Sequence, residues 1–433
     1  MNILLTTFGS LGDLHPYIAV GLGLRARGHD VTIATSAVYR PKVEGEGLSF
    51  HPVQPDVAGL ISDLSLMNKA YHPRTGGEFI MREVFLPHIA AGYADLLPAA
   101  READLLISHP LAFATPMVAE VLGKPWVAVI LQPALLISAW DPPSISGYPF
   151  LEHFRAFGPG FWRLFWRLGK SMIRKWAQPA IELRARLGLP ELQDPILSGM
   201  FSPFANQAWF SRIMASPQPD WPDHLEVTGF PFYDKLEPGK GLSAELDRFL
   251  KDGPAPVVFT LGSSAVFDAG PFYEESAKAA RALGLRAVLL VGTDPRNRPR
   301  QTDPNLFFAE YAPFSELFPR AAAIVHQGGS GTTAQALRSG KPMIFVPYSH
   351  DQPDNARRVA NLGAARVIPR HLYRADRIVT ELRRIIDQPE VGDASRRLAA
   401  ALFEEDGIRS VCEGIERVFE EFRAATSNRN PAA

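Results

Sequence analysis

The chain has 433 residues, of which 46% are hydrophobic and 21% are charged, a composition typical of globular proteins. Lys and Arg (45) nearly balance Asp and Glu (46), and the formal net charge of −1 gives no indication of a nucleic-acid-binding protein. The single cysteine, Cys412, excludes an internal disulfide and any metal site built from several cysteines.

The length and the amino terminus set the expected architecture. A chain of this length exceeds the usual single hydrophobic core, so two domains of roughly 200 residues each are expected. The start, MNILLTTFGSLGD, has no basic segment before its apolar run, and no apolar run reaches membrane-spanning length. We therefore expect a soluble cytoplasmic protein without a signal peptide.

The first elements are typical of a βαβ unit. An apolar strand over Asn2–Thr7 leads into the turn Phe8–Pro16, a helix over Tyr17–Arg27 and a second strand over Val31–Ala34. A dinucleotide site is the general alternative for such a turn. The turn has G-x-x-G spacing rather than G-x-G-x-x-G, and no acidic residue ends the second strand, which weakens that alternative.

The rest of the amino-terminal half alternates strands with polar connections. A helix is predicted over Ala112–Leu122, and residues 62–92, around Gly76 and Gly77, are predicted as a loop and helix over a ligand cleft. The first domain is predicted to span residues 1–230, and residues 231–241, with two prolines and two glycines, to form the linker. Further strands are predicted at Leu48–Val53, Leu105–Ser108, Pro125–Leu131, Ala208–Phe210 and Leu225–Gly229.

Residues 140–179 interleave aromatic and basic side chains. We favour a wall against a planar or lipidic ligand, then packing on the amino-terminal domain, and third a basic amphipathic helix on a membrane surface. The first two interpretations are compatible with each other. The residues concerned are Trp140, Tyr148, Phe150, Phe154, Phe157, Phe161, Trp162, Phe165, Trp166 and Trp176, with Arg163, Arg167, Lys170, Arg174 and Lys175 between them.

The carboxy-terminal half is predicted as a second domain over residues 242–412, followed by an amphipathic helix over 413–425 and a disordered tail over 426–433. Helices are predicted at Pro271–Leu283, Arg374–Ile386, Arg396–Phe403 and Glu413–Ala424. The first strand of this domain ends in Gly262-Ser263-Ser264. The predicted strands are Pro256–Leu261, Ala287–Val291, Leu306–Ala309, Ala321–Val325 and Pro342–Val346.

A glycine-rich turn follows the strand at Ala321–Val325. Its glycines permit positive φ angles and a close approach of the backbone to a ligand. Ser330 and Thr332 are predicted to cap a helix that runs to Ser339, and a helix N-terminus with free N–H groups is an anion site. We interpret it as the cradle for a diphosphate, with His326 beside it. The turn reads His326-Gln327-Gly328-Gly329-Ser330-Gly331-Thr332.

The next strand ends in a second polar turn that contains Asp351 and Gln352. An acid beside an amide at the carboxyl end of a strand suits a ligand rich in hydroxyl groups, because Asp accepts hydrogen bonds and Gln both donates and accepts them. Ligands of open α/β sheets bind at that end of the strands.

The stretch from Tyr311 to Arg358 resembles the donor-binding signature of the family 1 glycosyltransferases, the UGT-like enzymes of the GT-B fold. Bacterial macrolide, glycopeptide and sterol glycosyltransferases belong to that family, and a weaker ordered resemblance extends over nearly the whole chain. The resemblance implies an α/β protein with two Rossmann-like parallel-sheet domains facing each other across a cleft. The first domain would take the acceptor, the second the nucleotide sugar, and the final helix would cross back onto the first.

The resemblance also implies a set of donor-binding residues. Phe314 stands where plant members have Gln, and Ala334, with Gln335 next to it, where they have a ribose-binding Glu. Because of these two departures, a uridine diphosphate sugar and a deoxythymidine diphosphate sugar would both fit as donor. The implied donor residues are Gly12, Ser263, Tyr311, Ala312, His326, Gly328, Gly329, Ser330, Gly331, Thr332, Asp351 and Gln352.

Catalytic residues follow from the first turn by the same resemblance. Many members carry the acceptor-activating base as His in a G-H-x-x-P arrangement, and alignment on Gly12 and Pro16 places Asp13 there. A helix N-cap is the structural alternative for Asp13 and is compatible with catalysis. His15 is the second candidate base. His109 falls where plant members pair an Asp with the base, and a strand-end histidine without a role is its alternative.

The predicted reaction is an inverting, metal-independent transfer of a hexose to a hydroxyl group of an apolar polyphenol, sterol or polyketide. A nucleotide diphosphate sugar, with UDP-glucose favoured, would be the co-substrate, and no cofactor or nucleic acid is expected. The chain contains no Asp-x-Asp motif, which favours neutralisation of the diphosphate by a helix end. A nucleotide-sugar 2-epimerase, a non-catalytic nucleotide-sugar or glycan-binding protein and a nicotinamide oxidoreductase are the alternatives.

Overall fold

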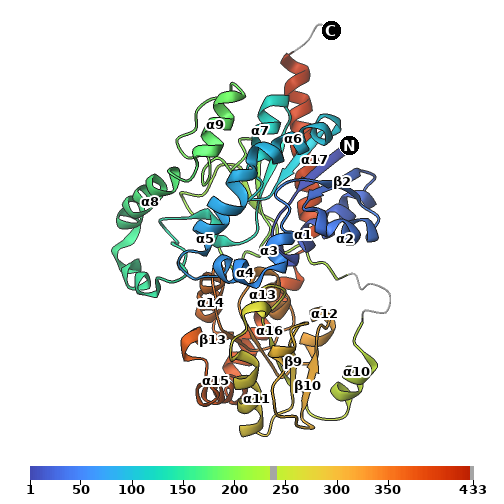
Figure 1. The fold of residues 1–433 in the computed structure, drawn as a ribbon, viewed down its shortest axis with the longest axis vertical. Helices are drawn as coiled ribbons and strands as arrows, with labels where there is room; N and C mark the ends of the chain where they lie inside the picture. The colour runs from blue at the N-terminus through green and yellow to red at the C-terminus, as the bar shows by residue number, and fades with distance from the viewer. Residues whose placement is uncertain (235–240, 430–433) are drawn as a thin grey trace.

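The computed structural model describes residues 1–234 and 241–429 and arranges them as two domains, one above the other in Figure 1. Each domain has its own sheet, and every strand pairing within both sheets is parallel. The predicted fold class, two Rossmann-like parallel-sheet domains, is confirmed. Of the predicted linker over residues 231–241, residues 235–240 lie outside the described part of the chain.

The amino-terminal sheet has the strand order β3-β2-β1-β4-β5-β6-β7. In β1, Leu5 lies between Ile33 on one side and Ile107 on the other, and all three are wholly buried. Burial on both faces is characteristic of parallel sheets, whose crossover helices cover both sides. The strands are β1 (Asn2–Thr6), β2 (Asp30–Thr35), β3 (Ser49–Pro52), β4 (Leu105–Ser108), β5 (Trp126–Ile130), β6 (Ala205–Ala208) and β7 (Leu225–Val227).

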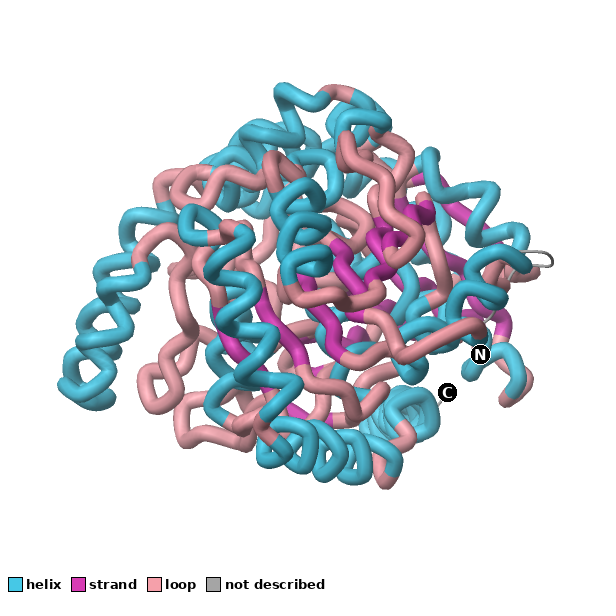
Figure 2. The backbone as a smooth tube through the Cα atoms, turned by 90° about the horizontal axis from the view of Figure 1, so that it is seen from below, coloured by secondary structure: helices cyan, strands magenta, loops and turns pink. Residues whose placement is uncertain are grey.

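The view from below shows helices around the strands of the molecule (Figure 2). Among the described residues of both domains, no helix is long and apolar enough to cross a membrane. The helical elements are α1 (Leu11–Ala26), η1 (Ala37–Tyr39), α2 (Arg40–Gly45), α3 (Ala58–Ser62), α4 (Leu64–Ala70), α5 (Gly76–Phe79), η2 (Ile80–Phe85), η3 (Leu86–His88), α6 (Ile89–Glu102), α7 (Ala114–Leu122), η4 (Pro133–Leu136), η5 (Pro149–Phe157), α8 (Gly158–Arg174) and α9 (Gln178–Arg186).

The carboxy-terminal sheet has the order β10-β9-β8-β11-β12-β13, so β8 and β11 lie at its centre. Its strands are β8 (Val257–Thr260), β9 (Ala287–Leu290), β10 (Leu306–Ala309), β11 (Ala323–His326), β12 (Met343–Phe345) and β13 (Ala365–Val367). The helical elements are α10 (Ala244–Lys251), η6 (Ala265–Asp268), α11 (Phe272–Ala282), η7 (Pro295–Asn297), α12 (Phe314–Leu317), η8 (Phe318–Arg320), α13 (Ser330–Arg338), α14 (Gln352–Asn361), η9 (Arg370–Leu372), α15 (Ala375–Asp387), α16 (Pro389–Phe403) and α17 (Gly407–Arg429).

The last helix, α17, leaves the carboxy-terminal domain and runs along the amino-terminal one, as Figure 1 shows in red. Ile408, Val411 and Ile415 pack with core residues of the first domain, and Arg27, directly after α1, forms an ion pair with Glu416 at 2.7 Å. The helix is longer than the predicted range 413–425. The predicted disordered tail is wrong for residues 426–429, which are helical, and residues 430–433 lie outside the described chain.

Three element boundaries also differ from the predictions. Helix α1 begins at Leu11 rather than at Tyr17, because Ser10 and a residue of the first turn form a capping box. Helix α16 begins at Pro389 rather than at Arg396, since proline suits the first helical position. Strand β6 covers 205–208 rather than 208–210, and its polar side chains are buried but hydrogen-bonded, which hid the strand from the apolar pattern.

Candidate functional site

The glycine turn after β11 brings the beginning of α13 to the boundary between the domains. Gly328 has a φ angle of +99°, and a Cβ there would meet the Phe345 ring at 2.9 Å, so both conformation and space require glycine. Gly329 is the N-cap residue. The predicted side-chain caps are wrong: no side chain caps α13, and the Ser330 hydroxyl donates to Asp351 Oδ2 at 2.9 Å instead. The first N–H groups of α13 are thereby left for a ligand.

His326, the last residue of β11, is wholly buried behind this turn. Its Nδ1 atom accepts a hydrogen bond from the Gly328 N–H at 3.2 Å, which places the ring proton on Nε2. Burial lowers the pKa of His326 to about 3, so the ring is neutral. Among the described residues, Nε2 has no hydrogen-bond partner. His326 can therefore act only as a neutral N–H donor.

Asp351 lies at the beginning of α14, beside the same turn. Its Oδ2 atom accepts from Ser330 and, at 2.7 Å, from Asn355 Nδ2, which also donates to the Gly328 carbonyl at 2.9 Å. Burial raises the pKa of Asp351 to about 6. Because both bonds use Oδ2, Oδ1 is the oxygen that can accept from a ligand hydroxyl.

Gln352 has a structural task that the sequence did not reveal. Its Oε1 atom accepts from the backbone N–H groups of Tyr348, at 2.7 Å, and Ser349, at 3.2 Å. The side chain is buried, and it fixes the turn in which His350 adopts a φ angle of +55°. Its oxygen is therefore committed to the turn, and the amide nitrogen is the part that remains for a sugar hydroxyl.

The other predicted donor residues lie in loops of the same domain, apart from Gly12. Ser263 is exposed in the loop after β8, where Gly262 has a φ angle of +66° and packs against Gln327. Tyr311 is 65% exposed, whereas Ala312 is buried. Gly12 approaches from the other domain: a Cβ on Gly331 would lie 3.9 Å from Gly12 Cα. The N-termini of α1 and α13 thus meet across the domain boundary.

On the amino-terminal side, Asp13 is fixed in the first turn of α1. Its Oδ2 atom accepts from the Ser10 N–H at 2.7 Å, and the Ser10 side chain accepts from the Gly12 N–H at 3.1 Å. Ser10, not Asp13, is therefore the N-cap residue, and Asp13 completes the capping box. Gly9, at φ +119°, has no room for a Cβ beside the Asp13 carboxylate. The S-x-x-D spacing was the signal that could have identified Ser10.

Asp13 and His109 lie together, and His15 lies apart from both. The His109 Nε2 atom is 3.5 Å from Asp13 Oδ1. The Leu111 N–H donates to His109 Nδ1 at 3.1 Å, so Nε2 carries the proton and faces the carboxylate. The His109 side chain is 4% exposed and that of Asp13 is 31% exposed, which makes the carboxylate the accessible member of the pair. The His15 ring stacks on Tyr233 at 4.8 Å, on another face of α1.

Tyr71 is a site residue that sequence reasoning missed. It follows α4, which packs against η6 of the other domain, and its ring edge contacts the His350 ring at 5.3 Å. Its hydroxyl lies beside the Ser264 side chain and within electrostatic range of Asp13 and Asp351. Burial raises the pKa of Tyr71 well above its ordinary value, so it remains a neutral donor. No local sequence signal identified it.

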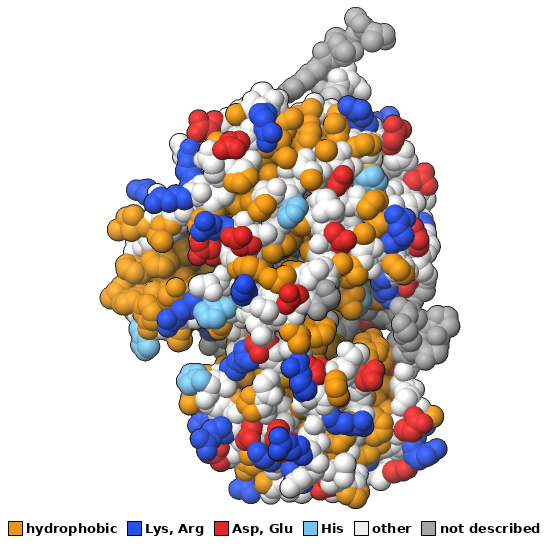
Figure 3. All heavy atoms as spheres, viewed as in Figure 1, with side chains coloured by type: hydrophobic (Ala, Val, Ile, Leu, Met, Phe, Trp, Pro, Cys, Tyr) orange, Lys and Arg blue, Asp and Glu red, His pale blue; other side chains and the backbone are white. Residues whose placement is uncertain are grey.

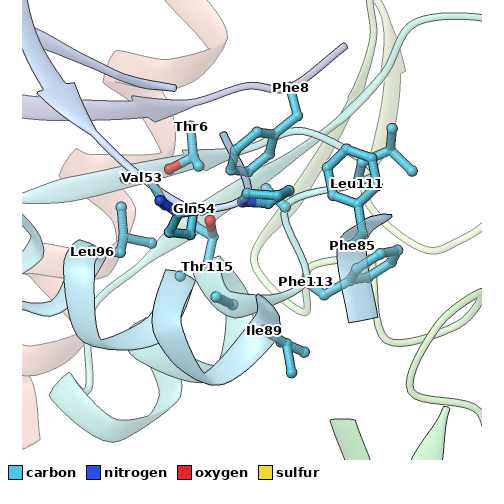
Figure 4. A pocket seen from close by; sticks show the side chains of 14 residues that line it. Thr6, Phe8, Val53, Gln54, Phe85, Ile89, Leu96, Leu111, Phe113 and Thr115 are labelled. Atoms are coloured by element: carbon cyan, nitrogen blue, oxygen red, sulfur yellow. The ribbon is translucent and has the colours of Figure 1, made fainter. Parts of the chain in front are cut away.

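A small cavity of about 20 Å³ lies in the amino-terminal domain, beside the loop that begins at His109 (Figure 4). Its lining is mostly apolar, with Phe8, Phe85 and Phe113 among the side chains shown. The hydroxyl oxygens of Thr6 and Thr115 also line it and have no hydrogen-bond partner within the described ranges. A cavity of this size holds about one water molecule.

Comparisons with known proteins agree with the two-domain fold described above. Residues 3–128 match the family model of the glycosyltransferase family 28 N-terminal domain, and residues 281–413 match that of the erythromycin biosynthesis protein CIII-like C-terminal domain. O-mycaminosyltylonolide 6-deoxyallosyltransferase of Streptomyces fradiae is 33% identical over 431 residues, covering 96% of this chain and 97% of that protein.

Two further proteins extend the comparison. Sterol 3-beta-glucosyltransferase of Candida albicans is 29% identical over 432 residues, and the match covers 96% of this chain but 27% of that longer protein. The solved structure of the glycosyltransferase VinC in complex with dTDP has a TM-score of 0.67 at 22% identity, with 97% of this chain and 100% of that chain covered. The structural likeness concerns the fold.

Proposed function

Because this chain belongs to the family 1 glycosyltransferases of the GT-B fold, we propose that it transfers a hexose from a nucleotide diphosphate sugar to a hydroxyl group of an apolar small molecule. The observation that carries the proposal is the meeting of the two helix N-termini at Gly12 and Gly331. One side of this meeting presents the Asp13–His109 pair, and the other presents Asp351 and the free N–H groups of α13.

Asp13 is the proposed general base. Its exposed carboxylate takes the proton of the acceptor hydroxyl as the oxygen attacks the anomeric carbon of the sugar. The buried His109 ring lies beside that carboxylate, with Nε2 at 3.5 Å from Asp13 Oδ1, and its burial keeps it from the acceptor. His15 has no part in this step, since its ring packs on Tyr233. Attack from the face opposite the leaving group inverts the anomeric configuration.

The leaving nucleotide diphosphate gains negative charge as the glycosidic bond breaks. The N–H groups at the beginning of α13 are oriented before the reaction and stabilise this charge without a metal ion. His326 contributes as a neutral N–H donor behind the turn. Asp351 Oδ1 and the Gln352 amide nitrogen hold hydroxyl groups of the sugar.

The nature of both substrates is part of the proposal. UDP-glucose and dTDP-hexoses are both candidate donors; the dTDP complex of VinC supports the second. For the acceptor, the names of the Streptomyces fradiae and Candida albicans relatives support a macrolide or a sterol, and polyphenols remain a third class.

The test is sugar transfer from UDP-glucose and from dTDP-hexoses to a macrolide aglycone, a sterol and a polyphenol, in the presence of a chelator. Mass spectrometry of the product identifies both substrates, and its anomeric configuration reports inversion. Acceptor-dependent transfer that Asp13→Ala or His326→Ala abolishes supports the proposal. Nucleotide binding without any transfer would favour a binding protein, and epimerised sugar without acceptor would favour a 2-epimerase.

A further inference from the structure

Helix α8 carries a row of exposed apolar side chains on the outside of the amino-terminal domain. Leu164, Leu168 and Met172 follow at four-residue spacing, so they share one stripe of the helix, and they are 55%, 60% and 67% exposed. Phe157, directly before the helix, is 62% exposed. Figure 3 shows a hydrophobic lobe at the left edge of the molecule, where Figure 1 places α8. Contiguous exposed apolar surface of this kind marks an interaction site.

A different face of α8 already anchors the helix to the protein. Trp162 is 2% exposed and packs in a small cluster with Ala139 and Leu151. Trp166 belongs to the same cluster, and its indole N–H donates to the Ser138 carbonyl at 3.2 Å. The exposed row is therefore not needed to hold α8 in place. Of the three interpretations of residues 140–179, packing on the amino-terminal domain accounts for Trp162 and Trp166. It does not explain the exposed apolar row.

The charged side chains of the stretch that carries the row are all basic, and three of them pair with acidic residues from outside it. Glu152 pairs with Arg155, Asp194 with Lys170 at 3.6 Å, and Glu191 with Arg174 at 2.8 Å. These three acidic partners come from outside the stretch 154–181, which contains six basic residues and no acidic one in a chain of net charge −1. The basic residues are Arg155, Arg163, Arg167, Lys170, Arg174 and Lys175.

The basic residues not engaged in those three pairs flank the apolar row. Arg163 and Arg167 directly precede Leu164 and Leu168 in the helix, and Arg163 lies over the ring of Trp140 at 5.6 Å. Lys175 follows at the carboxyl end of the helix, and Arg163, Arg167 and Lys175 are all exposed. A helix with an apolar stripe bordered by cationic side chains lies in the plane of an anionic lipid surface.

We propose that α8 is a membrane-surface helix that binds anionic lipid bilayers. Leu164, Leu168 and Met172 enter the boundary between head groups and acyl chains, and Arg163 and Arg167 contact lipid phosphates. The proposal stands on this surface alone and does not depend on the substrates of the transferase reaction.

Charge complementarity decides between the lipid surface and a second copy of the chain. In a symmetric dimer through the apolar row, Arg163 and Arg167 of the two copies would approach each other, while Glu152, Asp194 and Glu191 beside this region already pair with Arg155, Lys170 and Arg174. An anionic bilayer offers phosphates along the whole length of the row. The lipid surface is therefore the occupant that satisfies both the apolar and the cationic side chains.

Vesicle co-sedimentation of the full-length protein tests the proposal. The vesicles are phosphatidylcholine alone or phosphatidylcholine with phosphatidylglycerol. We expect binding to the anionic vesicles that weakens at high salt, because salt screens surface charge. The triple variant Leu164→Gln, Leu168→Gln, Met172→Gln and the double variant Arg163→Gln, Arg167→Gln are each expected to bind on the order of tenfold more weakly.

A matched control removes apolar surface elsewhere. Phe403, at the end of α16, is 73% exposed, and Phe403→Gln is expected to bind vesicles like the unchanged protein. Equal thermal unfolding temperatures across the variants show that they are folded. Absent binding, equal binding to both vesicle types, or unchanged binding of the triple variant overturns the proposal. A dimer that the triple variant dissociates, with no vesicle binding, overturns it in favour of a self-association surface.

Discussion

The two sides of the site are built in different ways. On the proposed donor side, defined by the loops 262–264, 326–332 and 349–352, local hydrogen bonds join the loops: Asn355 donates to the Gly328 carbonyl and to Asp351, and Ser330 donates to Asp351. The proposed acceptor side is defined by Asp13, His109 and residues 58–88. Residues 58–88 form short helices, one of them a π-helix, and contact the other domain through Tyr71.

The ligands proposed for the two sides would account for this difference. A diphosphate and sugar hydroxyls have fixed chemistry, and a glycine turn at a helix N-terminus with one carboxylate satisfies them through local bonds. An apolar acceptor requires shape, and shape is set by irregular segments that can vary without disturbing a sheet. We therefore expect the donor side to tolerate little change, and substitutions that separate the two sides provide the tests.

The largest expected effect separates chemistry on the acceptor side from binding on the donor side. Asp13→Asn keeps the shape of the side chain but removes the proposed base, so kcat should fall by about 10²–10⁴-fold. Nucleotide diphosphate affinity should stay unchanged, because the carboxylate binds Ser10 and lies beside His109 rather than in the α13 turn. Steady-state kinetics and calorimetry measure the two effects separately.

His15→Gln is the matched control for that variant, since His15 lies two residues further along the same helix. Its ring packs on Tyr233, so kcat is expected to change by only a few-fold. If the effects were reversed, with His15→Gln inactive and Asp13→Asn active, His15 would be the base and the proposed role of Asp13 would be wrong.

The next effect concerns an ionic contact that joins the two domains. Asp354 is wholly buried and accepts from Arg358 at 2.6 Å and from the Ser144 N–H of the other domain at 3.0 Å. Asp354→Ala leaves a buried guanidinium with less compensation and should lower the free energy of unfolding by about 3–5 kcal/mol. Denaturant unfolding measures this, with Glu44→Ala, in an exposed pair, expected to change it by less than about 1 kcal/mol.

A third prediction uses the pH dependence of the donor side. The pKa of Asp351 is raised to about 6 by burial, so the folded protein favours the protonated acid. The stabilisation that protonated Asp351 gives the folded protein is complete below pH 4, declines between pH 4 and 6, and is lost above pH 6. Asp351→Asn should therefore stabilise the protein at pH 8 by on the order of 2 kcal/mol and have little effect at pH 4. Equal effects at both pH values would contradict the prediction.

Prediction from sequence succeeded where the signals are local. The glycine turn from His326 to Thr332, between a strand and a helix, was predicted from glycines and small residues within a few positions. Asp13 was assigned from the resemblance of the first turn to the family, and its role stays a prediction. The strand order could not be read from such spacing: the pattern indicated a parallel βαβ unit at the start of the chain, and the two parallel-sheet domains were implied by the family resemblance. Strand β6 was misplaced because the burial of Asn206 and Gln207 depends on partners far along the chain.

The missed features of the site share one cause. Tyr71 becomes a site residue only because α4 packs against η6, a contact between domains that no local pattern encodes. Gln352 was expected to face the sugar, yet the bends at Tyr348 and Ser349 need its oxygen for their N–H groups. Long-range packing and backbone hydrogen-bond requirements therefore decided the details that the sequence pattern left open.

The smallest effect tests whether α17 is part of the amino-terminal domain. A Cβ on Gly23 would lie 2.6 Å from Ile408 Cγ2 and 3.1 Å from Cys412 Sγ, so Gly23→Ala must displace α17 from α1. We expect the free energy of unfolding, measured by thermal denaturation, to fall by about 1 kcal/mol, even though alanine favours helices. Gly169→Ala, in open space on α8, should instead gain up to about 1 kcal/mol. If both variants gained stability, α17 would move away from α1 at little cost in free energy. It would then not be part of the amino-terminal domain, which would end with β7.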